Sequence, residues 1–107
     1  MTATPTPTPA APADWGEPRS KTITWYDPMQ AASAGAGMTG IDHLRAIRDG
    51  LLPPPPIASH FGFRIVEVEP GDVTFLCLPD ESAYNPIGLV HGGLVCTLLD
   101  SALGCAV

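Results

Sequence analysis

Basic side chains are scarce in this chain. Its 107 residues include five Lys and Arg against eleven Asp and Glu, which gives a formal net charge of −6. Charged residues make up 15% of the chain, whereas about 25% is usual for a globular domain. A protein that binds nucleic acid needs a basic surface to neutralise phosphates. The composition therefore excludes nucleic acid from the expected partners.

Cysteine is also scarce, and the spacing of its three copies is uninformative. Cys77, Cys96 and Cys105 form no CxxC pair, which argues against a disulfide framework or a zinc knuckle. We expect no metal site, and we expect Cys96 and Cys105 to serve as small core side chains. The N-terminus lacks a basic segment followed by an apolar one, as a signal peptide would have. A reducing cytoplasm is the expected location.

Proline is abundant, with 13 copies, and it divides the chain into three parts. Residues 1–22 are rich in Pro, Thr and Ala and are predicted to be a disordered tail. Residues 23–56 are predicted to be an extension with a short amphipathic helix, in which Trp25 and Tyr26 are the first side chains expected to pack on a core. Residues 57–107 are predicted to form the main domain.

The helix of the extension has clear local signals. Thr39 followed by Asp42 resembles a capping box, and Gly50 is a natural stop. Apolar residues recur between them at helical spacing, at Ile41, Leu44 and Ile47. The four prolines of residues 53–56 prevent this helix from continuing.

Two weaker signals in the same region are given structural interpretations. Residues 35–40 (GAGMTG) match the dinucleotide-binding pattern GxGxxG, but no buried strand precedes them as that site requires. We predict a flexible loop of small residues there. His43 is expected to be solvated on a charged helix face, and His60 is expected to be structural.

A β-hairpin is predicted next. Residues 61–69 and 73–78 are rich in β-branched and aromatic side chains, and Pro70 and Gly71 occupy the central positions of a type II turn between them. Residues 79–86 then form a polar loop.

The last segment, residues 92–107, is predicted to be a helix that is apolar nearly all round and therefore buried in protein. His91, Asp100 and the lack of a basic flank argue against a membrane span. A buried Asp100 would be costly unless something pairs with it or uses it. Asp100 is therefore either a functional carboxylate or a side chain pointing to a polar edge.

The start of this helix is also suggestive. His91, Gly92 and Gly93 follow a loop that contains Asn85 and Gly88. The first amides of a helix are unsatisfied donors at the positive end of its dipole, and they can stabilise an oxyanion. An ordinary turn from loop to helix is the alternative.

Taken together, residues 85–93 (NPIGLVHGG) and 98–102 (LLDSA) resemble the PaaI-type hotdog-fold thioesterases, whose pattern is NxxGxxHGG followed by six residues and an Asp. The resemblance covers roughly residues 61–107. It implies an α+β hotdog fold, in which an antiparallel sheet wraps around a central helix. The activity it implies is hydrolysis of acyl-coenzyme A, or a related pantetheine thioester, without a cofactor.

The resemblance also implies roles for individual residues. Asp100 matches the catalytic carboxylate, as general base or as nucleophile. Gly92 matches the oxyanion-hole amide, Asn85 matches the side chain that assists at the thioester carbonyl, and His91 matches the position that orients the site. Gly88 and Gly93 are expected to bind substrate.

The spacing of these residues bears on assembly. Gly92 and Asp100 are eight residues apart, which is about 12 Å along a helix. An oxyanion donor and a base must both lie within about 3 Å of the reacting atoms. Two antiparallel helices of a two-fold dimer can supply both. We therefore expect a homodimer or a dimer of dimers with shared sites.

One feature argues against an active 107-residue chain. The sequence stops at Val107 inside the apolar helix, and only two strands are evident. We expect an incomplete hotdog domain, the N-terminal part of a longer protein. The alternative function is a non-catalytic hotdog module that binds acyl thioesters or dimerises. The sequence does not specify which acyl group the substrate carries.

Overall fold

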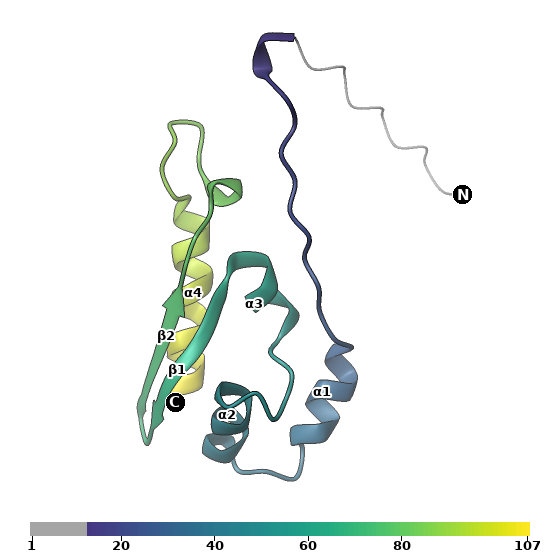
Figure 1. Ribbon diagram of the computed structural model, residues 1–107. Coiled ribbons are helices and arrows are strands. Elements are labelled where there is room, and N and C mark those ends of the chain that lie inside the picture. The colour runs from purple at the N-terminus through teal and green to yellow at the C-terminus, as the bar shows by residue number, and fades with distance from the viewer. Residues whose placement is uncertain (1–12) are drawn as a thin grey trace, which may run out of the picture.

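The computed structural model describes residues 13–107, so residues 1–12 of the predicted tail lie outside it. The described chain is a mixed α+β structure in which helices pack against one two-stranded antiparallel sheet (Figure 1). In chain order its elements are η1 (Ala13–Trp15), α1 (Pro28–Gly35), α2 (Gly40–Arg48), α3 (Pro56–Phe61), β1 (Phe63–Glu69), β2 (Asp72–Cys77), η2 (Glu81–Ala83) and α4 (Gly92–Ala106).

The predicted hairpin is confirmed. β1 pairs with β2 in antiparallel register from Phe63 opposite Cys77 to Glu69 opposite Asp72, with an irregularity between Ile65 and Glu67. Gly71 has a φ of +71°, as the third position of a type II turn requires. The first strand begins two residues later than predicted because Phe61 ends α3, and Gly62 (φ +68°) terminates that helix.

One face of the hairpin forms the core. Phe63, Ile65 and Val68 of β1 are buried, and the ring of Phe63 contacts that of Phe75 edge-on at 5.9 Å. α2 packs on β1 and α4 packs on β2. Both helices line one cavity with Phe63, Ile65 and Phe75, which places them on the same side of the sheet.

The predicted extension helix is confirmed as α2. The Thr39 hydroxyl accepts the N–H of Asp42 at 3.3 Å, and Gly50 follows the helix with a φ of +76°. The Arg45 guanidinium donates to the backbone oxygen of Val68 from Nε at 3.3 Å and from Nη2 at 3.2 Å. This contact attaches α2 to the end of β1.

Two α-helices of the described chain, α1 and α3, were not predicted. The loop of small residues predicted for residues 35–40 connects α1 to α2, although Gly35 is the last residue of α1 and Gly40 is the first residue of α2. Asp27 starts α1 by accepting the N–H of Met29 at 2.9 Å, and Pro28 fits the first helical position. The ring of His43 packs on Gly35, where a Cβ would approach it to 2.6 Å. The prediction of a solvated His43 is therefore wrong.

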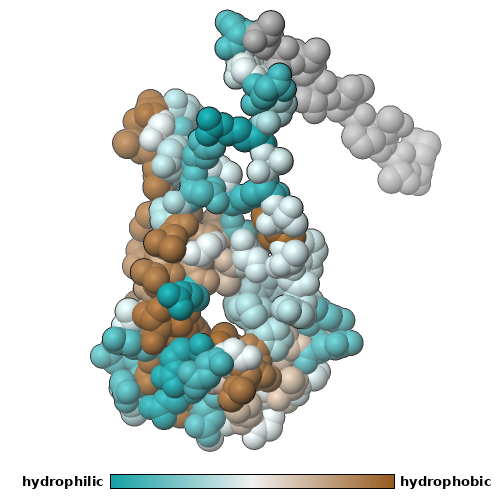
Figure 2. All heavy atoms as spheres, in the orientation of Figure 1, coloured by the Kyte–Doolittle hydropathy of each residue, from teal (hydrophilic) through white to brown (hydrophobic). Residues whose placement is uncertain are grey.

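The helix predicted for residues 92–107 is confirmed as α4, but the prediction that it is buried is wrong for the described chain. Leu94 is buried, whereas Val95, Leu99 and Leu103 are 46%, 55% and 67% exposed. The hairpin covers only one side of α4, and apolar surface gathers along the side of the molecule that α4 and the hairpin form (Figure 2). Cys96 lies on the uncovered side and is exposed, which corrects its assignment to the core.

The aromatic residues that precede α1 are less buried than predicted. Trp25 is 58% exposed, and Tyr26 is also exposed. Trp25 stacks on the ring of His60 with 6.2 Å between ring centroids, and this contact gives His60 a structural role.

No helix in residues 13–107 is long and apolar enough to cross a membrane.

Candidate active site

The loop between η2 and α4 is shaped by Asn85. Its Oδ1 accepts the N–H groups of Ile87 at 3.1 Å and Leu89 at 3.0 Å, and its own N–H donates to the oxygen of Leu89 at 2.7 Å. Gly88 has a φ of +80°, a conformation that glycine adopts without strain. Because the carbonyl end of the Asn85 side chain holds the loop, its amide NH₂ remains the end that can donate to a ligand.

His91 is the N-cap of α4. Its Nδ1 accepts the N–H of Gly93 at 2.7 Å, and its own N–H donates to the oxygen of Ala83 at 2.8 Å. A Cβ on Gly93 would lie 2.9 Å from Nδ1 of His91, so the cap requires glycine there. His91 therefore fixes both the start of α4 and the position of the loop that carries Asn85.

Gly92 supplies the open donor at this end of α4. Its N–H is the first amide of the helix and has no acceptor among the hydrogen bonds of residues 13–107. A Cβ built on Gly92 would meet nothing within 4 Å, so a ligand can approach the backbone closely. The helix dipole adds positive potential at this point.

Asp100 lies on the uncovered side of α4 and is exposed. The expectation of a buried carboxylate is therefore wrong for the described chain, because no element covers this face. Val95, Leu99 and Leu103 follow one another at four-residue spacing along α4, and Leu99 and Leu103 are near Asp100; all three are also exposed. Asp100 is thus the only charged side chain of α4 and stands on an apolar surface.

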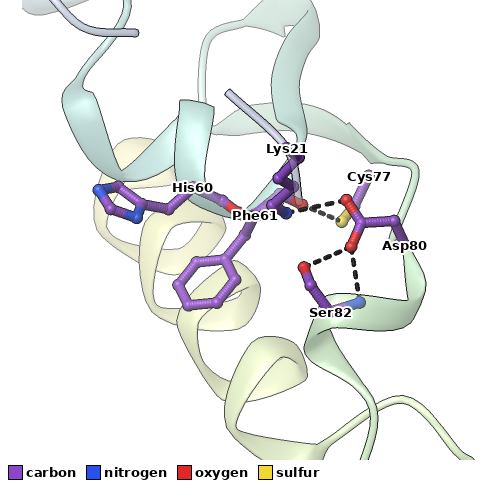
Figure 3. Close-up of polar contacts among 6 residues, drawn as sticks. All are labelled: Lys21, His60, Phe61, Cys77, Asp80 and Ser82. Atoms are coloured by element: carbon purple, nitrogen blue, oxygen red, sulfur yellow. Dashed lines mark hydrogen bonds and ion pairs between the residues drawn. The ribbon is translucent and has the colours of Figure 1, made fainter. Parts of the chain in front are cut away.

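The sequence did not predict the contacts that residues near the N-terminus make with the segment just before the Asn85 loop (Figure 3). Lys21 donates to Asp80 at 2.8 Å, and Asp80 in turn accepts the N–H of Ser82 at 2.8 Å and caps η2. Arg19 pairs with Glu81 at 2.6 Å. Part of the segment predicted to be a disordered tail therefore contacts η2, the short helix that precedes Asn85.

The Asp80 contact gives a testable dependence on pH. The hydrogen bond from Lys21, and to a smaller extent those from Ser82, lower the pKa of the Asp80 carboxyl from 3.8 to about 2. Since the pKa is lowered on folding, the contact stabilises the structure above pH 3.8 and is lost as the pH falls through about 2. Fluorescence of Trp25, read in a Trp15→Phe background, is expected to change in this window. The same titration of Asp80→Asn should lack that step, and a step of equal size there would contradict the assignment.

The described residues contain no group of three or more His, Cys, Asp or Glu side chains placed to hold a metal ion. His91 and Gly92 form the start of α4, and Asn85 lies on the loop whose Asn85–Leu89 and Ala83–His91 hydrogen bonds lead to that start, whereas Asp100 is two helical turns away. Cys105 is partly buried beside the sheet, and this burial raises the pKa of its thiol.

No family model, curated protein or solved structure matches this chain. The chemical interpretation therefore depends on the geometry of these residues and on the motif that contains them.

Proposed function

We propose that the chain belongs to a hotdog-type hydrolase of acyl-CoA or related pantetheine thioesters, with each site shared between two copies. The observation that carries this proposal is the open N–H of Gly92 at the start of α4, beside the Asn85 loop that His91 positions. These donors suit a carbonyl oxygen that becomes negatively charged. The spacing of Asn85, His91, Gly92 and Asp100 in the PaaI-type motif supports the same chemistry.

The order of the elements supports the hotdog assignment. A tight antiparallel hairpin is followed by a loop and then by the 15-residue helix α4, which packs on the apolar face of the hairpin. In a hotdog domain, a sheet wraps around one such helix. The exposed side of α4 is then the side available to a second copy of the chain.

In the proposed reaction, the thioester carbonyl oxygen accepts hydrogen bonds from the N–H of Gly92 and the amide of Asn85. The carboxylate of Asp100 from the second copy attacks the carbonyl carbon directly or removes a proton from an attacking water. The tetrahedral intermediate collapses and the C–S bond breaks. In the water route, the proton that Asp100 took from water passes to the departing thiolate, and the free acid is released. In the direct route, the thiolate takes a proton from solvent, and water then hydrolyses the anhydride between the acyl group and Asp100 to release the acid and restore the carboxylate. The donors stabilise the charge that develops on the carbonyl oxygen.

Sharing of the site is supported by distance and exposure. Gly92 and Asp100 are about 12 Å apart along α4, which is too far for both to act on one carbonyl. Asp100 is exposed among Val95, Leu99 and Leu103. An antiparallel packing of two α4 helices would bury this apolar row and bring the Asp100 of one copy to the Gly92 of the other.

The experiment is a thiol-release assay with a series of acyl-CoA substrates. The purified full-length protein is expected to release free coenzyme A with saturable kinetics, and the matched His91→Ala variant is expected to release it more slowly, because its loop and first helical turn lose their anchor. Acyl-CoA binding without release of thiol would contradict hydrolysis and would support the non-catalytic binding module instead.

A further inference from the structure

A cavity of ≈ 640 Å³ lies between the N-terminal extension, the sheet and α4. The residues that line it are mostly apolar and include Leu44, Ile47, Leu52, Phe63, Ile65 and Phe75. In Figure 2 the molecule is hollowed between the apolar side formed by α4 and the hairpin and the paler N-terminal half. The volume is within the range of small-molecule sites, about 300–1,000 Å³.

The cavity is adjacent to the helix face that carries the candidate carboxylate. Ser101 and Cys105 of α4 form one of its walls. Asp100 directly precedes Ser101, which places it about 100° around the helix and 1.5 Å along it. A group that reacts beside Asp100 can therefore extend past Ser101 into the cavity of the same copy.

The charged groups at the cavity do not favour a polar ligand. Arg48 is engaged by Asp49, with 2.8 Å between Nε and Oδ1. Arg64 also lines the cavity, but its side chain is exposed between the buried Phe63 and Ile65 of β1, which places its charge at the solvent side of the cavity. The interior that remains is apolar, which matches an aliphatic chain and not a phosphate or a sugar.

We propose that this cavity binds the acyl chain of the thioester, so that α2 and residues 51–55 determine acyl-chain length. This inference rests on the proposed function, and it extends the site to residues outside the motif. The preferred substrate class is a thioester with an unbranched aliphatic chain of medium length. Short acyl groups leave the cavity unfilled.

The test fills the cavity and measures kcat/KM against acyl-chain length. Ile47→Trp and, separately, Leu52→Trp are compared with Ile57→Trp, which changes a residue of α3 outside the cavity. For decanoyl-CoA, each filling variant is expected to lower kcat/KM at least about tenfold, the scale of apolar pocket discrimination. Acetyl-CoA hydrolysis should remain unchanged, as should both activities of Ile57→Trp.

A direct binding measurement separates this inference from the proposed function. Titration of Asp100→Asn protein with decanoyl-CoA should show binding that Ile47→Trp or Leu52→Trp abolishes. The same loss of binding in a protein that hydrolyses no thioester would support the cavity site and overturn only the hydrolytic function. Equal losses for acetyl-CoA and decanoyl-CoA, or no loss for either, would overturn the cavity assignment.

Discussion

Replacing Asp100 with Asn is expected to lower thioester turnover by at least about a hundredfold, the usual scale for a general base or nucleophile. The amide keeps the shape of the side chain but can neither accept a proton from water nor attack the carbonyl carbon. Thiol release at saturating acyl-CoA, measured for the wild-type protein and the variant at equal concentration, gives the ratio directly.

The Asp100→Asn variant should fold normally because Asp100 is exposed and its carboxylate accepts no hydrogen bond among the described residues. Its melting temperature is expected to match that of the wild-type protein. Asp72→Asn, an equivalent change at an exposed position of β2, is the matched control and should retain full turnover. Unchanged hydrolysis in Asp100→Asn would remove Asp100 from the reaction.

Elements with strong local signals could be predicted from the sequence. The hairpin followed from the alternation in residues 61–78 and the turn at Pro70 and Gly71. α2 followed from its cap at Thr39 and its apolar spacing. In each case neighbouring residues contain the information, because turns and caps are satisfied within a few positions.

α1 was not predicted, although its sequence contains a local signal. Asp27 and Pro28 are a cap and a first-turn residue of the kind that starts helices. Ala31, Ala32 and Ala34 have high helix propensity. That pair before an alanine-rich run was the signal that could have identified the helix.

Features that depend on distant partners could not be predicted. Lys21 and Asp80 are 59 residues apart, and no local pattern links them. The burial of Asp100 was inferred from a helix that is apolar all round, but such a pattern does not specify which element covers it. The hairpin covers one side of α4 only, so Asp100 stays exposed. The motif predicts its catalytic role, and that role stays a prediction.

A mixture of two inactive variants is expected to regain activity if the site is shared. In Asp100→Asn each site lacks its carboxylate, and in Asn85→Ala each site lacks the side-chain donor of the oxyanion hole. A dimer with one chain of each kind has one site with both defects and one intact site. Random exchange in an equal mixture would leave about one quarter of all sites intact.

The central claim is therefore tested most directly by thiol release from acyl-CoA in that mixture, after native mass spectrometry has confirmed exchange of the chains. The account predicts that turnover rises from the low level of either variant alone to about one quarter of the wild-type value. Turnover that stays at the level of the separate variants, with exchange complete, would contradict a site built from Gly92 of one copy and Asp100 of the other.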